Sequence, residues 1–302
     1  MEKVYDSVII GAGPAGITAA IYLKRANKDI LLIEKATPGG QITKSSTVEN
    51  YPGFVQISGP DLASKFYEQI TNLDVSYKMG EVESIKKNET FEVLLKDEVI
   101  KSKSIILAVG KEPKNLKAKN SKNLVGSGIS FCSLCDGSLY KKEDVAIVGG
   151  GNSALEEALY LASICKSVTI LNRSDALRGD SVLINKVNEK ENINVLFETS
   201  VKEFVGNNNK LDYLLIEKNG KEEKLDVEAC FIFIGYKPAT DFLSELDILD
   251  STGYIEVDKN LETKIKGIYA CGDCVKKSAY QIVTATSDGA IAAVNCIKGQ
   301  EK

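Results

Sequence analysis

The 302-residue chain contains no histidine and no tryptophan. Without histidine it cannot form a Ser/His/Asp triad, use a histidine base or bind a metal through imidazole. Acid–base chemistry therefore falls to Asp, Glu, Lys, Tyr, Cys or water. An excess of positive charge is also missing, because 38 Lys and Arg residues stand against 42 Asp and Glu residues and leave a net charge of −4. Nucleic-acid binding through a basic footprint is thus not expected.

Long hydrophobic runs are equally scarce. The longest, such as 105–109 and 145–148, are far shorter than the stretch of about 20 apolar residues that spans a bilayer. The N-terminus lacks the basic region and cleavage site of a signal peptide, and residues 4–10 are typical of a first strand instead. We therefore expect a cytoplasmic protein with no membrane partner. The length predicts roughly two domains.

Two glycine-rich turns follow apolar runs. The first turn is Gly-Ala-Gly-Pro-Ala-Gly at 11–16, after the run 4–10, and the second is Gly-Gly-Gly-Asn-Ser-Ala at 149–154, after the run 144–148. Each is followed by a helical stretch and a further strand. This order is typical of the unit that binds a dinucleotide, with the pyrophosphate on the helix N-terminus. Two ordinary turns of an α/β protein are the alternative.

The two copies differ in the residue that ends the second strand. Glu34 lies 23 positions after Gly11, close to the spacing at which a carboxylate accepts hydrogen bonds from an adenosine ribose. A carboxylate there fits FAD or NAD and repels a 2′-phosphate. In the second copy this position is Asn172, with Arg173 and Arg178 nearby. The sequence therefore predicts a complete first site and a compromised second one.

Seven cysteines in a chain without an export signal do not indicate a disulfide scaffold. Four of them form two CxxC pairs, Cys132–Cys135 and Cys271–Cys274. We do not favour a zinc site, because the pairs lie about 140 residues apart and each has another explanation. The first pair can close a small disulfide ring and reopen to an attacking thiolate, with Asp136 beside it to move a proton. An inert buried pair is the alternative. For the second pair we favour packing over redox chemistry.

Polar segments that contain proline follow two apolar runs, at 111–119 and 236–240. These segments are plausible hinges, and they predict one domain inserted into another, with boundaries near 113 and 242. The expected domains are 1–112 together with 243–302, and the inserted domain 113–242.

Several segments of the chain resemble the low-molecular-weight thioredoxin reductases. The resemblance covers nearly the whole chain, in order and at matching spacings. The segments are Gly39-Gly40-Gln41-Ile42-Thr43, Val48-Glu49-Asn50-Tyr51-Pro52-Gly53-Phe54, Cys132 to Gly137, and Gly272-Asp273. The resemblance implies an α/β fold of two Rossmann-like, three-layer ββα nucleotide-binding domains, the second inserted into the first. It also implies an FAD-containing homodimer that reduces a thioredoxin-like partner, with rotation of the inserted domain.

The resemblance assigns roles to individual residues. Cys132 and Cys135 match the redox pair, with Cys132 attacking the partner and Cys135 facing the flavin, and Asp136 matches the acid of the family. Further positions match the residues around FAD: Gly11, Gly13, Ala15, Gly16, Glu34, Gly40, Gln41, Asn50, Gly272, Asp273 and Gln281. Tyr280 stands where the family has an Arg beside the flavin, and its ring can stack on the isoalloxazine.

Departures from the family leave the electron donor open. NADPH-dependent members carry a His-Arg-Arg cluster with a further Arg, where this chain has Asn172-Arg173-Ser174 and Arg178. Each charged hydrogen bond lost to the 2′-phosphate costs about 1.5–3 kcal/mol. A ring of Tyr280 stacked on the flavin also takes the place of nicotinamide. These changes resemble members that use reduced ferredoxin, which we favour. NADPH is the first alternative and NADH the second, and a redox-sensing flavoprotein without turnover is the non-enzyme alternative.

Overall fold

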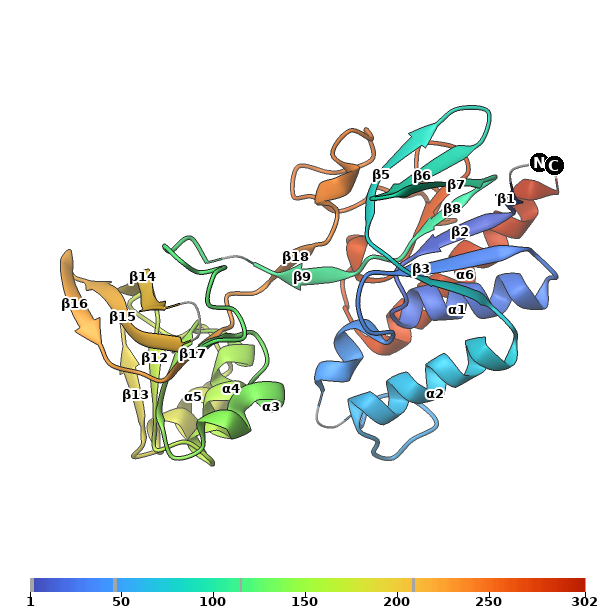
Figure 1. The fold of residues 1–302 in the computed structure, drawn as a ribbon. Coiled ribbons are helices and arrows are strands. Elements are labelled where there is room, and N and C mark those ends of the chain that lie inside the picture. The colour runs from blue at the N-terminus through green and yellow to red at the C-terminus, as the bar shows by residue number, and fades with distance from the viewer. Residues whose placement is uncertain (1–2, 46–47, 115, 208–209, 302) are drawn as a thin grey trace. The chain divides into compact units, whose positions relative to one another are not determined.

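The computed structural model describes residues 3–45, 48–114, 116–207 and 210–301. The chain divides into two compact units, which Figure 1 shows: unit 1 is Met1–Glu112 with Lys237–Lys302, and unit 2 is Pro113–Tyr236. The second crossing therefore lies at Tyr236, which corrects the expected boundary at 242. The segment after Tyr236 packs with unit 1, because the Ala239 N–H donates to the Gly110 carbonyl at 3.1 Å and Phe242 packs against the core of that unit.

Unit 1 is built on a five-stranded parallel sheet in the order β19-β8-β2-β3-β4. Except for the edge strand β4, the strands are largely apolar and buried, as expected for strands that are covered on both faces. Their bounds are β2 (Ser7–Ile10), β3 (Ile30–Glu34), β4 (Ser76–Met79), β8 (Ile105–Leu107) and β19 (Ile268–Ala270).

Alternate residues of these strands face two separate layers. Ile9, Leu32 and Ile106 pack with the helices α1 (Pro14–Arg25) and α6 (Ile282–Gln300). Val8 and Ile10 pack instead with an antiparallel layer on the other face (Figure 1). That layer contains β5 (Val82–Lys87), β6 (Phe91–Leu95) and β7 (Glu98–Ser102), extended by β1 (Val4–Tyr5). The expected three-layer ββα arrangement is confirmed in this unit.

Unit 2 repeats the same three layers. Its parallel sheet has the order β10-β17-β11-β12-β13. Val145 and Ile147 pack with the helices, whereas Ala146 and Val148 pack with the antiparallel layer. The sheet strands are β10 (Ile129–Ser130), β11 (Asp144–Val148), β12 (Ser167–Leu171), β13 (Ile193–Leu196) and β17 (Ala229–Ile232). The helices are α4 (Asn152–Ala162) and α5 (Ser181–Asn188), and the antiparallel strands are β14 (Thr199–Asn207), β15 (Lys210–Lys218) and β16 (Lys221–Leu225).

Several predicted site residues lie in or beside short elements. These elements are η1 (Gly40–Lys44), α3 (Ser133–Asp136), η2 (Gly137–Tyr140), η3 (Asp241–Leu243) and η4 (Gly272–Cys274). The longer helix α2 (Gly59–Asn72) lies between β3 and β4 in the chain. The two crossing segments, β9 (Lys111–Pro113) and β18 (Tyr236–Pro238), pair with each other. Among the helices in the described ranges, none has the length and apolar character needed to cross a bilayer.

Candidate active site

The first glycine turn joins β2 to α1. At two of its positions, Gly11 and Gly16, the neighbouring backbone leaves no room for a side chain. Gly11 has φ +103°, and a Cβ on it would lie 2.4 Å from the Ala108 carbonyl oxygen. A Cβ on Gly16 would lie 1.8 Å from the Gly11 oxygen, so helix and turn pack directly against each other. Gly13, in contrast, has no atom within 4 Å of such a Cβ. The open side of the turn therefore lets a phosphate group approach the backbone at the start of α1.

Glu34 ends β3 beside this turn. Its carboxylate accepts hydrogen bonds from the Ala12 N–H at 2.7 Å and from the Ala36 N–H at 2.9 Å. These bonds fix the side chain and leave each oxygen a further lone pair. The carboxylate borders a cavity of about 260 Å³ in unit 1, whose lining includes Gly11, Lys35, Glu81, Val82 and Phe242. The arrangement fits the ribose of an adenosine.

The next predicted FAD residues also gather in unit 1. A Cβ on Gly40, which has φ +59°, would lie 3.4 Å from the Cα of Gly13, so η1 reaches the first glycine turn. The Asn50 amide donates to Gln281 Oε1 at 3.2 Å across a separation of 231 residues. Gln281 is also the N-cap of α6, where it forms a capping box with Thr284. Asn50 is thereby tied to the start of α6.

Gly272 and Asp273 form the turn of η4. Gly272 has φ +76°, and a Cβ on it would lie 2.8 Å from that of Ala15, which places η4 against α1. The Gly272 N–H donates to Asp288 Oδ2 at 3.1 Å, and the Lys277 ammonium forms an ion pair with the same oxygen.

Asp273 itself has no hydrogen bond or ion pair to any residue within the described ranges. Burial raises the pKa of its carboxyl, although the charge of Lys111 acts against the increase. A half-buried carboxyl without a partner fits a ligand that brings hydroxyl donors, such as the ribityl chain of FAD. Together with the open glycine turn and the fixed Glu34, it makes the residues of unit 1 suitable for FAD.

Lys111 is a residue of this site that the sequence reasoning missed. Its ammonium lies 3.0 Å from the centroid of the Tyr280 ring and 5.3 Å from that of Tyr254. Its carbonyl accepts a hydrogen bond from the Gln41 amide at 3.0 Å. A cation held this close to an aromatic face is an attractive cation–π contact. A basic residue a few positions after the buried strand β8 was a signal for it, because that edge of a parallel sheet carries ligand sites.

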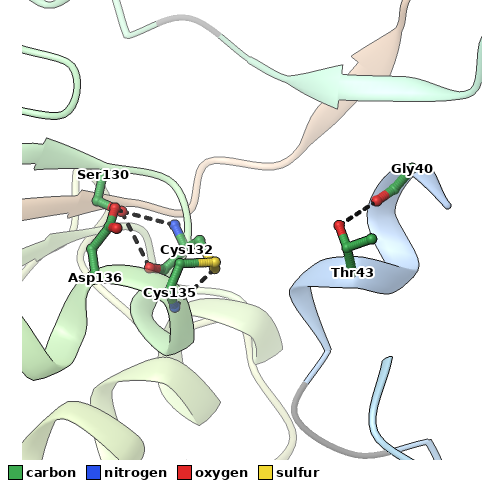
Figure 2. The surroundings of a disulfide bond; sticks show 6 residues. All are labelled: Gly40, Thr43, Ser130, Cys132, Cys135 and Asp136. Carbon is green, nitrogen blue, oxygen red and sulfur yellow. Dashed lines mark hydrogen bonds between the residues drawn. A yellow bond between two sulfur atoms is a disulfide. The ribbon is translucent and has the colours of Figure 1, made fainter. Parts of the chain in front are cut away.

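The redox pair lies in unit 2, at the start of α3. Cys132 and Cys135 form a disulfide with their Cα atoms 5.4 Å apart (Figure 2). Cys132 is the N-cap of α3, and its Sγ accepts the Cys135 N–H at 3.1 Å. Cys135 is exposed and Cys132 is half-buried. A backbone donor aimed at sulfur favours the thiolate of Cys132 once the disulfide opens.

Asp136 is held by a serine that the sequence reasoning also missed. The Ser130 hydroxyl at the end of β10 lies 2.7 Å from Asp136 Oδ2 and accepts the Cys132 N–H at 3.0 Å (Figure 2). The spacing Ser-x-Cys before the pair was the only local hint of this contact.

The same figure shows the Thr43 hydroxyl donating to the Gly40 carbonyl at 2.8 Å within η1.

The second CxxC motif differs from the first in its burial. Cys271 and Cys274 are both fully buried free thiols. Burial raises the pKa of Cys274 to about 11 and that of Cys271 well above its usual value. The Cys274 thiol donates to the Cys271 carbonyl at 3.2 Å. These thiols are poor nucleophiles, which favours the packing role.

The second glycine turn joins β11 to α4 and keeps its crowded geometry. Gly149 has φ +148°, and a Cβ on it would lie 2.4 Å from the Phe233 oxygen, whereas Gly151 is open. The side chain of Asn172 is buried beneath the turn, and a Cβ on Gly150 would lie 2.6 Å from its Oδ1.

The polar residues after β12 are largely bonded to one another. The Asn172 amide donates to the carbonyls of Ser174 at 3.2 Å and Ala176 at 2.8 Å. The Arg178 guanidinium donates to Ser174 Oγ at 2.6 Å. Arg173 is exposed. Among the residues expected near a 2′-phosphate, the amide of Asn172 is thus hydrogen-bonded within the loop. The positive charge comes from Arg173 and Arg178.

Comparisons with known proteins identify the family. The profile of the family "Pyridine nucleotide-disulphide oxidoreductase" matches residues 5–289. The chain belongs to this family. Within it, the chain is 40% identical to a thioredoxin reductase of Bacillus subtilis over 295 residues, which cover 97% of this chain and 93% of that protein.

Solved structures of the pyridine nucleotide-disulphide oxidoreductase family agree with the fold. The thioredoxin reductase of Lactococcus lactis matches with a TM-score of 0.87 and 36% identity, over 98% of both chains. A ferredoxin-flavin thioredoxin reductase of Clostridium acetobutylicum matches with a TM-score of 0.56 and 28% identity, over 100% of this chain and 99% of that one. The predicted membership among low-molecular-weight thioredoxin reductases is confirmed. By class, the chain is an FAD-dependent disulfide oxidoreductase.

Proposed function

We propose that this chain reduces the disulfide of a thioredoxin-like protein through Cys132 and Cys135. The observation that carries the proposal is the disulfide at the start of α3, in which Cys135 is an exposed residue and the Cys132 sulfur accepts a backbone N–H. That arrangement makes Cys132 the better nucleophile, because the N–H stabilises its thiolate. Cys135 then resolves the intermediate.

Electrons, protons and disulfide bonds are all accounted for by the two cysteines and the partner disulfide. The pair first takes up two electrons and two protons. The Cys132 thiolate attacks one sulfur of the partner, a mixed disulfide forms, and the other partner sulfur leaves as a thiolate and takes a proton. The Cys135 thiolate then attacks the Cys132 sulfur, the internal disulfide re-forms, and the partner leaves as a dithiol. We assign Asp136 as the acid that holds and delivers the proton.

FAD, when bound, supplies the electron pair that opens the disulfide. We propose that unit 1 holds it through the first glycine turn, the Glu34 carboxylate and the η4 turn. The residues we assign to this role are Gly11, Gly13, Ala15, Gly16, Glu34, Gly40, Gln41, Asn50, Gly272, Asp273, Tyr280 and Gln281.

The test uses Cys135→Ser, with Cys165→Ala as the control because Cys165 is a buried free thiol in the same unit. The purified flavoprotein is reduced with dithionite under nitrogen, freed of excess reductant and mixed with oxidised thioredoxin. In this single turnover we expect wild type and the control to convert each thioredoxin disulfide that reacts into two thiols. We expect Cys135→Ser to release no reduced thioredoxin, because the mixed disulfide at Cys132 then has no resolving thiol. Normal reduction by Cys135→Ser contradicts the mechanism. Flavin that bleaches and reoxidises without reducing any thioredoxin indicates a redox sensor instead.

Two electron donors are each supported by one observation. Reduced ferredoxin is supported by the loop after β12, where Ser174 binds the guanidinium of Arg178 and the Asn172 amide is bonded to the backbone. NADPH is supported by the second glycine turn, because Gly151 leaves it open to a phosphate and Arg173 is exposed.

Anaerobic titration of the oxidised protein separates the donors. Bleaching of the flavin band by NADPH or NADH establishes a nicotinamide donor and refutes the ferredoxin proposal. Bleaching by reduced ferredoxin, followed by thioredoxin reduction, in protein that neither nucleotide bleaches establishes ferredoxin. The homodimer and the cytoplasmic location stay predictions.

A further inference from the structure

A lysine and two tyrosines from distant segments meet in unit 1. Lys111 begins β9, Tyr254 lies between η3 and β19, and Tyr280 lies just before α6. The Lys111 ammonium is 3.0 Å from the centroid of the Tyr280 ring and 5.3 Å from that of Tyr254, and the two ring centroids are 6.2 Å apart. These distances place Tyr254 on the same side of the Tyr280 ring as the ammonium. The opposite face of Tyr280 is therefore turned away from both groups.

The aromatic contact fixes the Lys111 ammonium. Within the described ranges the half-buried Lys111 side chain forms no ion pair and no hydrogen bond, so the ring face of Tyr280 is its close partner. The Lys111 backbone is tied to η1, because its carbonyl accepts the Gln41 amide at 3.0 Å. The charge of Lys111 also opposes the rise in the pKa of the Asp273 carboxyl. Lys111 thus lies among residues that we assign to FAD.

The Tyr280 ring is held at its hydroxyl end as well. Its oxygen accepts the Lys277 N–H at 3.3 Å. The Lys277 ammonium pairs with Asp288, whose carboxylate also accepts the Gly272 N–H. The ring is therefore connected at one end to the η4 turn and is covered on one face by Lys111.

We propose that Lys111 is a positioning residue that holds the Tyr280 ring against the isoalloxazine of FAD and thereby keeps dihydronicotinamides away from the flavin. The inference rests on the proposed assignment of Gln41, Asp273 and Tyr280 to FAD. With a cation on one face, the ring keeps its opposite face for a second planar group. A hydride needs direct contact between donor and flavin, whereas an electron can pass through intervening atoms. The ring therefore selects against hydride donors and not against a reduced protein.

The first readout is the fluorescence lifetime of bound, oxidised FAD, which involves no turnover. A tyrosine in contact with oxidised isoalloxazine quenches its emission by electron transfer, so we expect a short lifetime in wild type. In Lys111→Met the ratio of long-lived to short-lived flavin should rise by about 2- to 30-fold, the factor that a cation–π contact contributes to a two-state equilibrium. Lys111→Arg should keep the wild-type value, because a guanidinium also binds aromatic faces.

The matched control is Lys87→Met. The Lys87 ammonium lies 5.5 Å from the centroid of the Phe91 ring, on the paired strands β5 and β6 of the same unit. This variant loses the same kind of contact away from the residues assigned to FAD, and we expect the wild-type lifetime from it. Tyr280→Leu should lengthen the lifetime, and Lys111→Met should add nothing in that background, because Lys111 acts through the ring.

The second readout is anaerobic bleaching of the flavin by 1-benzyl-1,4-dihydronicotinamide. This probe has no ribose or phosphate, so it does not depend on the nucleotide-type turn of unit 2. One hydride, two electrons and a proton together, passes from the probe to the oxidised flavin, and the probe leaves as the 1-benzylnicotinamide cation. We expect the rate constant to rise by the same factor in Lys111→Met, and to stay at the wild-type value in Lys111→Arg and Lys87→Met.

Four results overturn the inference. They are a Lys111→Met variant that matches wild type, an equal change in Lys87→Met, a longer lifetime without faster bleaching, and a further effect of Lys111→Met in the Tyr280→Leu background. Wild-type protein that binds no FAD refutes both the assignment of unit 1 to FAD and this inference. Failure of the wild type to reduce thioredoxin, with the Lys111 effects intact, refutes the proposed function and leaves this inference standing.

Discussion

Replacing Asp288 with Asn removes the charge on which the η4 turn depends. The Asp288 carboxylate accepts the Gly272 N–H and pairs with the Lys277 ammonium, and the two charged side chains are 19% and 15% exposed. Asn can still accept the N–H, so the variant mainly leaves the ammonium without its partner. Removing one member of a buried pair costs about 3–5 kcal/mol, whereas an exposed pair is worth about 0–1 kcal/mol.

The partial exposure of this pair places the expected loss between those limits, at about 2–3 kcal/mol. For a unit of this size that corresponds to a decrease in Tm of about 4–12 °C. The assay is urea and thermal unfolding at fixed FAD concentration, because bound ligand itself stabilises the folded state. Release of FAD by dilution should also be faster, since the Gly272–Asp273 turn loses part of its support.

The control is Asp247→Asn, which breaks an ion pair with Lys264 in which the Asp247 side chain is 93% exposed. We expect less than about 1 kcal/mol from it. The double variant Asp288→Asn with Lys277→Met should recover part of the loss, because no ammonium is then left unpaired. Equal losses in the Asp288 and Asp247 variants, with unchanged FAD release, would refute the reasoning.

Three further predictions follow from local geometry. Gly16→Ala should not yield folded flavoprotein, because its Cβ would meet a carbonyl oxygen at 1.8 Å; FAD content on purification checks this. Cys271 and Cys274 should resist iodoacetamide in the native protein at pH 8, because burial raises the pKa of both thiols; peptide mapping detects any labelling. Lys166 lowers the pKa of Asp144, so the stabilisation by Asp144 is present above the unfolded pKa, about 3.9, and is lost as pH falls through the folded value. Asp144→Asn should therefore reduce stability more at pH 6 than at pH 2.5, as measured by urea unfolding.

The sequence predicted the parts of the fold that depend on local pattern. The second nucleotide-type unit begins with strand 144–148 and continues with strand 167–171, as the structure has them. In the first unit the expected strand 4–10 is interrupted at Asp6, whose neighbours belong to separate sheets. Hydrophobic runs and glycine spacing indicate where strands and helices lie. They do not indicate that the two ends of one run belong to different sheets.

Contacts between segments that are distant in the sequence could not be predicted from local sequence patterns. Lys111, the first residue of β9, meets Tyr280, which lies just before α6. The two residues are far apart in the sequence, and no local pattern in either segment indicates the contact. The boundary at Tyr236 was missed for a related reason. A proline-containing segment marks a hinge, but the packing of Phe242 against the unit 1 core decides where the hinge ends.

The burial of the remaining thiols affects the fidelity of repeated redox cycles. All five cysteines outside the Cys132–Cys135 pair are buried in the folded protein. A mixed disulfide at Cys132 therefore has one resolving thiol, three residues away, and no accessible competitor on the same chain. Scrambling into a wrong internal disulfide would require local unfolding, so the rate of mispairing should follow the opening of the core and not the rate of turnover.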